Sequence, residues 1–178
     1  YESAKIGLVG PDYVKITSIE ELNKIKDSLD SNIIGIDAGA GIMNATEKAI
    51  EKYNLDFELI SSSGPAMTAA LKGAIDKKEP IAVTGWDPHW KFARYDLKFL
   101  DDPKNVFGQV EKIKFICRKG FKKDMPKIAN LFENVSFDKK QISTLMDYIA
   151  HAENSERQAV QKWTDDNKEL VESWKKTK

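Results

Sequence analysis

Short apolar runs alternate with amphipathic stretches over residues 4–100, and this alternation is the feature that most limits the fold. The runs 4–9, 32–36, 57–60, 81–85 and 97–100 have the length and composition of buried strands. Helical patterns separate them at 19–29, at 42–53 and after Pro65. Strands that alternate with helices are typical of βαβ units. The sequence therefore predicts an α/β fold with a mostly parallel sheet and flanking helices.

The pattern becomes helical towards the C-terminus. A last strand is predicted at 113–117, and Asp124, Asp138 and Ser155 are predicted to cap three helices after Gly120. Trp163 and Trp174 have helical spacing and are predicted to pack inside this segment. The predicted domains are 1–118, an α/β ligand-binding lobe that includes the hinge strands, and 119–178, a C-terminal helical segment.

The charge balance and the rarity of cysteine and histidine argue against several classes of function. The chain carries 28 basic and 28 acidic residues, whereas nucleic-acid binders usually show a basic excess. The single cysteine, Cys117, excludes an internal disulfide and is predicted to be buried in its apolar stretch. Two histidines do not suit a His-rich zinc site. We predict no nucleic-acid partner, no metal and no cofactor.

Large aromatic residues surround a turn after the strand at 81–85. That strand stops at Gly85, and Trp86, His89 and Trp90 surround the Asp87-Pro88 turn. Turns after strands lie at a sheet edge, where binding residues tend to gather. One interpretation is that these rings cap the core. Another is that Trp86 offers its ring face to the cation of a ligand.

A glycine-rich turn, Gly39-Ala40-Gly41, lies between a strand and a helix and has three interpretations. The first is a dinucleotide site, but Asn44 stands where the fingerprint needs its third glycine, and no Walker lysine follows. The second is a carboxylate site made of backbone N–H groups. The third is an ordinary tight turn.

Catalytic patterns are weak. His89 as a base, Asp37 as its orienter and a serine from 61–63 as nucleophile would make a triad, but no Gly-x-Ser-x-Gly motif occurs. The serines are better explained as helix caps. We predict a binding module, with a small-molecule enzyme on a partial dinucleotide-binding turn as the alternative. An anion site facing an aromatic cation site at one sheet edge suits a zwitterion with a quaternary ammonium group, which remains one idea among several.

Three motifs in order resemble one family. They are Gly35-Ile36-Asp37-Ala38-Gly39-Ala40-Gly41-Ile42-Met43, Ala66-Met67-Thr68-Ala69-Ala70-Leu71, and Thr84-Gly85-Trp86-Asp87-Pro88-His89-Trp90 followed by Tyr95 to Pro103. Their sequence and spacing resemble the glycine betaine/proline-betaine substrate-binding proteins of osmoprotectant ABC transporters. The likeness covers nearly the whole chain.

The resemblance implies one lobe of a type II periplasmic-binding-protein fold, whose two lobes close on the ligand. It implies that Gly41 and Ile42 hold the betaine carboxylate through backbone N–H groups and that Trp86 is one wall of a tryptophan box. His89 is a further ligand-binding candidate. Gly39, Ala40, Met43, Pro88 and Trp90 are the supporting residues. The implied partners are glycine betaine or a similar zwitterion and a transporter permease subunit, and the implied location is outside the cytoplasm.

The chain departs from the family pattern at one residue and in length. Ala38 stands where proline is common, with little expected effect because the site uses backbone atoms. Family members are usually longer, and the motifs for the second lobe, with its further tryptophans and its histidine, do not occur here. We therefore expect a chain that lacks the lobe preceding residue 1, binds betaine weakly alone, and self-associates through its exposed half-cleft.

Overall fold

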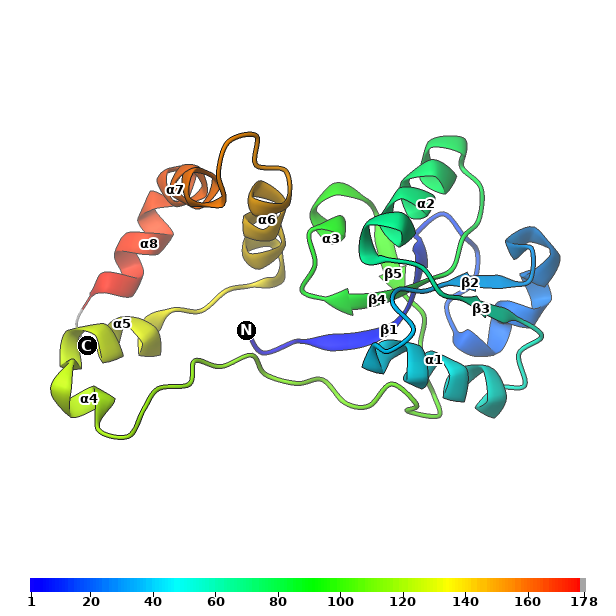
Figure 1. The fold of residues 1–178 in the computed structure, drawn as a ribbon, viewed down its shortest axis with the longest axis horizontal. Helices are drawn as coiled ribbons and strands as arrows, with labels where there is room; N and C mark the ends of the chain where they lie inside the picture. The colour runs from blue at the N-terminus through cyan, green and yellow to red at the C-terminus, as the bar shows by residue number, and fades with distance from the viewer. Residues whose placement is uncertain (177–178) are drawn as a thin grey trace. The chain divides into compact units, whose positions relative to one another are not determined.

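The computed structural model describes residues 1–176, which form two compact units (Figure 1). The sheet unit comprises residues 4–87 and 95–110, and the helical unit comprises residues 1–3, 88–94 and the chain from 111 onwards. The chain therefore passes from one unit to the other after residues 3, 87, 94 and 110. The predicted domain boundary at residue 118 stays a prediction.

The sheet unit is built on five strands. They are β1 Lys5–Pro11, β2 Asn32–Ile34, β3 Glu58–Ile60, β4 Val83–Asp87 and β5 Leu97–Phe99, in the order β3-β2-β4-β1-β5. β2 is parallel to β3 and to β4, whereas β1 is antiparallel to β4 and to β5. Four of these five strands thus share one direction. The predicted α/β fold with a mostly parallel sheet is confirmed, with β1 as the reversed strand.

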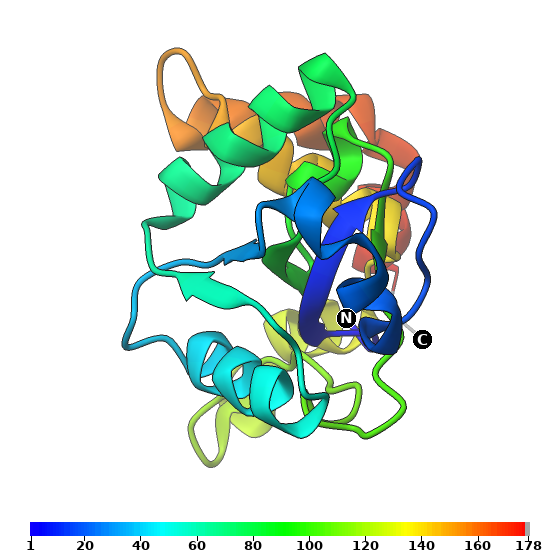
Figure 2. The same ribbon diagram turned by 90° about the vertical axis from the view of Figure 1, so that its right-hand side faces the viewer.

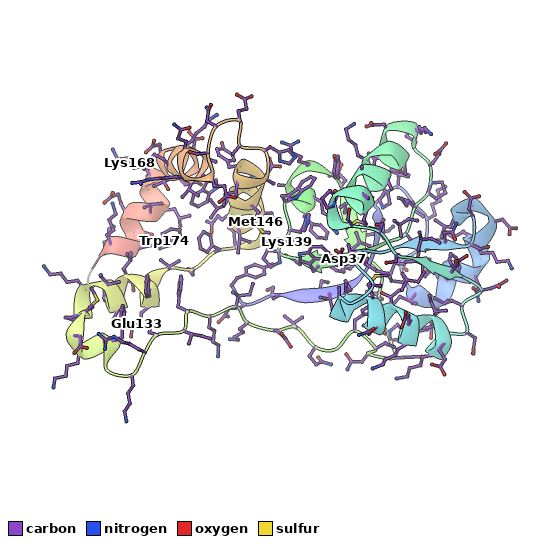
Figure 3. The ribbon with its side chains drawn as sticks, in the orientation of Figure 1. Asp37, Glu133, Lys139, Met146, Lys168 and Trp174 are labelled. Carbon is purple, nitrogen blue, oxygen red and sulfur yellow. The ribbon has the colours of Figure 1, made fainter. Side chains whose placement is uncertain are left out.

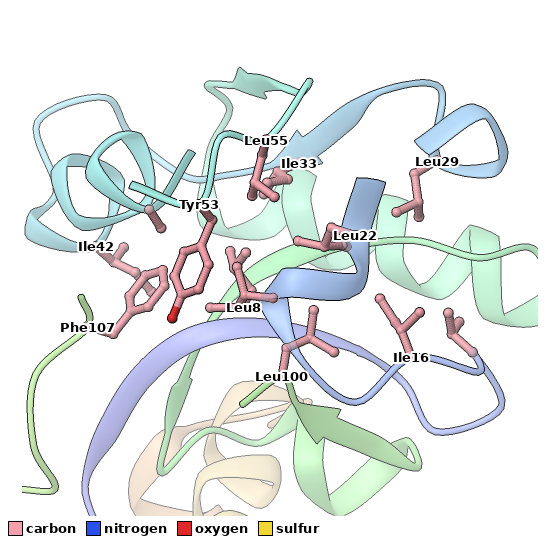
Figure 4. Packing of buried hydrophobic residues seen from close by; sticks show 14 of the residues in the cluster. Leu8, Ile16, Leu22, Leu29, Ile33, Ile42, Tyr53, Leu55, Leu100 and Phe107 are labelled. Atoms are coloured by element: carbon pink, nitrogen blue, oxygen red, sulfur yellow. The ribbon is translucent and has the colours of Figure 1, made fainter. Parts of the chain in front are cut away.

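Helices cover both faces of this sheet. In the two views, α1 (Gly41–Lys52) and α2 (Gly64–Lys77) lie on opposite sides of the strands (Figures 1 and 2). The 3₁₀ helix η1 (Ile19–Leu29) shares a hydrophobic core with α1. The members of this core drawn in Figure 4 include Leu8, Ile16, Leu22, Leu29, Ile33, Ile42, Tyr53, Leu55, Leu100 and Phe107. This packing fixes the first turn of α1 against the sheet.

Local capping signals set several helix starts as predicted. Ser18 and Glu21 form a capping box at η1, in which the Glu21 carboxylate accepts from the Ser18 N–H at 3.3 Å. The Ser63 hydroxyl accepts from the Ala66 N–H at 3.2 Å, so α2 begins at Gly64, one residue before the predicted first position, Pro65.

Six helices make up most of the helical unit. They are α3 Lys91–Arg94, α4 Phe121–Asp124, α5 Pro126–Asn134, α6 Lys139–Ala150, α7 Glu156–Asp166 and α8 Lys168–Lys175. Asp138 caps α6 and Ser155 caps α7, as predicted. Trp163 and Trp174 are buried and both contact Phe137, which confirms that they are packing residues. None of the helices within residues 1–176 has the length and apolarity that crossing a bilayer requires.

The predicted cap at Asp124 is wrong. Asp124 is the last residue of α4, and the next helix begins at Pro126 with Met125 as its N-cap. Proline suits a first helical position because its missing N–H would have no partner there. The proline rather than the acidic residue therefore sets this boundary.

The predicted strand at 113–117 is also wrong, and so is the predicted burial of Cys117. Within residues 1–176 this stretch joins no β-ladder, and Cys117 is exposed. Phe115 and Ile116 are 57% and 96% exposed. A strand needs a neighbour for its backbone groups, and here only Ile113 and Tyr1 exchange backbone hydrogen bonds, at 2.8 and 3.2 Å, across this part of the described chain. The local pattern is strand-like, but the sheet partner is missing.

Candidate ligand-binding site

The glycine-rich turn between β2 and α1 leaves two backbone donors free. The Asp37 carbonyl accepts from the Ala40 N–H at 2.9 Å, and the Ala40 carbonyl accepts from the Met43 N–H at 2.9 Å. No acceptor within residues 1–176 takes up the N–H groups of Gly41 and Ile42. Figure 3 labels Asp37 at this turn. Both donors lie at the positive end of the α1 dipole, which favours an anion.

Space remains open around this turn. A Cβ atom added at Gly39 or Gly41 would meet no atom within 4 Å. A Cβ added at Gly35, just before the turn, would instead overlap the Met43 thioether. Packing of this unit therefore explains the glycine at 35, while the glycines at 39 and 41 leave room in which a ligand can approach the backbone.

The turn is supported from the core side. Met43 is 2% exposed, and its sulfur accepts a hydrogen bond from the Ile36 N–H. The nitrogen and the sulfur are 3.2 Å apart. Ala40 packs against the hydrophobic core cluster. The free N–H groups are thus carried on a backbone that buried atoms hold in place.

Trp86 lies in the same unit as the glycine-rich turn. It is on β4, opposite Ile6 of β1, and its half-buried ring packs against the core cluster. α1 contacts β4. The ring therefore covers part of the core while another part stays exposed, so the two interpretations of this tryptophan are compatible.

The remaining candidates, Pro88, His89 and Trp90, belong to the helical unit. His89 is 7% exposed, and its Nδ1 accepts from the Lys91 N–H at 3.1 Å, so the ring caps the start of α3. Burial, together with the charge of Lys91, lowers the pKa of His89 to about 4. The imidazole is therefore neutral at pH 7 and carries its proton on Nε2. Its ring centroid lies 5.3 Å from that of Trp90.

Sequence reasoning missed Lys91. Its side chain is fully buried, and desolvation lowers the pKa of its ammonium to about 8. The four-residue helix α3 is too short to show a periodic buried face, so the sequence pattern could not predict that Lys91 is buried. Among residues 1–176, no group of three histidine, cysteine or acidic side chains is placed to hold a metal ion.

Lys91→Met is expected to remove a pH-dependent part of the stability. Since the pKa of Lys91 falls from 10.5 to about 8 on folding, the unfolded chain binds more protons between these values. The native protein should therefore gain up to about 3 kcal/mol relative to the variant as pH rises from 8 to 10.5. Urea unfolding across this range measures it, with exposed Lys15→Met as control. Parallel pH profiles for wild type and Lys91→Met would contradict the assignment.

A family model described as the substrate binding domain of ABC-type glycine betaine transport systems matches residues 1–166. The chain belongs to this family. Among curated relatives, the glycine betaine/carnitine transport binding protein of Listeria monocytogenes is 44% identical over 151 residues, which make up 83% of this chain and 50% of that protein. The chain thus spans about half the length of this curated relative.

Solved structures of the same family share the fold. The lactococcal protein OpuAC, crystallised closed with glycine betaine, is 38% identical with a TM-score of 0.76, over 98% of this chain and 68% of that one. The glycine betaine/L-proline-binding protein ProX of Borrelia burgdorferi is also 38% identical, with a TM-score of 0.74 over 98% and 66% of the two chains.

The family settles two of the predictions made from the sequence. The recognised resemblance is confirmed, and so is the type II periplasmic-binding-protein fold, of which the chain covers a part. The family model and the curated relative are both described as transport binding proteins, which favours the predicted binding module over the enzyme alternative.

Proposed function

We propose that this chain supplies the α/β ligand-binding lobe of an extracytoplasmic substrate-binding component of an ABC transporter, and that its ligand is glycine betaine or a related quaternary ammonium osmoprotectant. The observation that carries the proposal is the pair of free N–H groups at Gly41 and Ile42, next to the open space at Gly41 and in the same unit as Trp86. The names of the relatives from Listeria and Lactococcus support this ligand class.

The ligand carboxylate binds at the first turn of α1. It accepts hydrogen bonds from the Gly41 and Ile42 N–H groups, and the helix dipole adds to the attraction. Gly39 and Gly41 lack the Cβ atoms that would crowd it, while Ala40 and Met43 anchor the turn to the core. Because these donors are neutral, a zwitterion binds without leaving an unbalanced protein charge.

The quaternary ammonium group binds against the face of Trp86. Such a cation has no N–H to donate, so an aromatic ring face is the group that recognises it. Trp86 is one wall of a tryptophan box, and further walls come from another part of the protein. Pro88, His89 and Trp90 follow this wall in sequence, and the buried His89 ring fixes the turn that they form.

The partner in the membrane is a transporter permease subunit. In this proposal the ligand-binding lobe spans residues 1–118, and the helical segment that begins at residue 119 reaches the other lobe. Self-association through exposed apolar surface belongs to the same proposal. It is supported within the helical unit by exposed Phe115 and Ile116, beside an apolar groove of about 840 Å³ that Phe115, Phe121 and Phe132 help to line.

Calorimetric titration with three related ligands tests the proposal. Glycine betaine carries both charged groups, choline lacks the carboxylate, and glycine lacks the quaternary ammonium group. Two half-sites predict that glycine betaine binds most tightly and that each of the others loses one part of the binding energy. Equal affinity for glycine and glycine betaine would rule out the aromatic cation site.

Trp86→Ala is expected to weaken glycine betaine binding about tenfold. One aromatic face contributes about 0.5–2 kcal/mol to a bound cation, and about 1.4 kcal/mol corresponds to tenfold. Trp86→Phe keeps a smaller ring and should retain part of the affinity. Calorimetry gives the affinities, and thermal unfolding checks that each variant is folded, because Trp86 also covers the core. Unchanged affinity in a folded Trp86→Ala protein would place the cation elsewhere.

A further inference from the structure

Within the helical unit, one carboxylate joins α3 to α6. Asp147 on α6 is bound by the Arg94 guanidinium Nε at the end of α3. The same carboxylate oxygen lies 3.1 Å from Nδ1 of His151, the C-cap residue of α6, and this nitrogen also lies 3.1 Å from the Asp147 backbone carbonyl oxygen. The Asp147 side chain is 22% exposed, so protein atoms cover most of it. A single acidic group therefore holds two side chains from two helices.

Both partners of Asp147 contact the ring of Trp90. The His151 ring meets Trp90 edge-on, with centroids 4.7 Å apart and planes at 89°. The Arg94 guanidinium carbon lies 5.9 Å from the centre of the Trp90 ring. The orientation of this tryptophan thus depends on two groups whose positions Asp147 sets.

A second contact ties α3 to α6 without Asp147. The Lys139 ammonium at the start of α6 lies 4.4 Å from the centre of the Phe92 ring (Lys139 is labelled in Figure 3). Loss of Asp147 therefore leaves the two helices in contact and changes chiefly the surroundings of Trp90. This makes a selective effect on Trp90 measurable in a folded protein.

We propose that Asp147 is a positioning residue of the ligand site: by holding Arg94 and His151 against Trp90, it fixes the turn 88–90 that continues directly from the Trp86 strand. Asp147 touches no ligand in this scheme. It acts through α3, which the chain inserts between β4 and β5. The expected effect of Asp147 on betaine affinity rests on the proposed function. Its effect on the orientation of Trp90 does not, because it needs no ligand.

A control pair is available on another helix. Asp76 pairs with Lys72 across one turn of α2, and both side chains of that pair are 58% exposed. Exposed pairs of this kind contribute little. Asp76→Ala removes a carboxylate from a helix as Asp147→Ala does, but that carboxylate holds neither of the two groups that contact Trp90.

The test uses the full chain labelled with fluorotryptophan and fluorine NMR. Four tryptophans give four signals, and Trp90→Phe identifies the one from Trp90. Asp147→Ala should shift that signal and weaken glycine betaine binding on the order of three- to tenfold, while Asp76→Ala should change neither. The double variant Arg94→Asp with Asp147→Arg restores an oppositely charged pair and should recover part of both effects.

Each result decides the inference. A Trp90 signal that stays in place in folded Asp147→Ala overturns it. If Asp147→Ala fails to fold, the milder Asp147→Asn variant, which keeps the side-chain shape, should still shift the Trp90 signal, and an unmoved signal there overturns it too. If the Trp90 signal shifts but neither the wild type nor any variant binds betaine, the proposed function is contradicted. The positioning of Trp90 by Asp147 is then still supported.

Discussion

Replacing Gly41 by aspartate is expected to abolish most glycine betaine binding while leaving the fold intact. Gly41 is the first residue of α1, outside the left-handed backbone region, and a Cβ there meets nothing within 4 Å. An acidic residue in a first helical turn stabilises the helix by about 0.3–1 kcal/mol. The new carboxylate occupies the space of the ligand carboxylate and repels it.

The expected loss of affinity is large because two charge-assisted hydrogen bonds are lost together. Hydrogen bonds to charged groups contribute about 1.5–3 kcal/mol each, so a loss of roughly a hundredfold or more follows. Gly64→Asp is the matched control. Gly64 is the first residue of α2, and a Cβ added there also meets nothing within 4 Å.

Calorimetry and thermal unfolding together separate binding from folding in these two variants. Gly64→Asp should bind as the wild type does, and both should unfold at or above the wild-type temperature. The smaller Gly41→Ala variant should show an intermediate loss of affinity. Full affinity in Gly41→Asp would mean that the carboxylate does not reach the first turn of α1.

Trp163→Ala is expected to produce the largest loss of stability, about 3–5 kcal/mol. The Trp163 side chain is 2% exposed, its Nε1–H donates to the Thr144 hydroxyl at 3.1 Å, and its ring centroid lies 6.0 Å from that of Phe137. Truncation leaves a cavity between α6 and α7 and removes the donor from Thr144. Urea unfolding followed by circular dichroism measures the change.

Val160→Ala on the same helix is the control for that loss. Val160 is 40% exposed, and a substitution at such a surface position usually changes stability by less than about 1 kcal/mol. Similar losses in the two variants would show that Trp163 packs no better than a surface residue. Trp163→Phe should lie between them, because it keeps an aromatic ring and loses the hydrogen bond.

Features set within a few residues could be predicted from the sequence. The caps at Asp138 and Ser155 depend on a hydrogen bond to an N–H three residues away, so the local pattern contains the whole interaction. The strand and helix order of the sheet unit follows from the same kind of local periodicity. The recognised motifs then gave the family, which the comparisons confirm.

Features that depend on distant partners could not be predicted. β1 lies between β4 and β5 and is antiparallel to both, and a strand pattern encodes neither the neighbours of a strand nor its direction. Ile113 to Cys117 have strand-like residues, but strand formation depends on a neighbour elsewhere in the chain. The wrong boundary at Asp124 is different, because the deciding residue, Pro126, was visible two positions away.

The candidate site shows the same division. The glycine-rich turn indicated free N–H groups at a helix start, but the turn pattern alone also fitted a nucleotide or no ligand. The open space at Gly41 and the half-buried ring of Trp86 became visible only with the structure. The Lys91 N–H donates to His89, and Asp147 links Arg94 to His151. The spacing of these residues in the sequence predicts neither contact.

The four crossings between the two units have a consequence for the order in which the chain can fold during its synthesis. All residues of the sheet unit precede residue 111, so the chain that forms this unit is complete once residue 110 has emerged from the ribosome. Residues 1–3 and 88–94, which include α3, belong to the helical unit, so they can pack fully only after the chain beyond residue 110 has been made. Fully native burial of Lys91 and the Asp147 bridge are therefore late events, and the nascent chain exposes Trp90 and Phe92 until α6 appears.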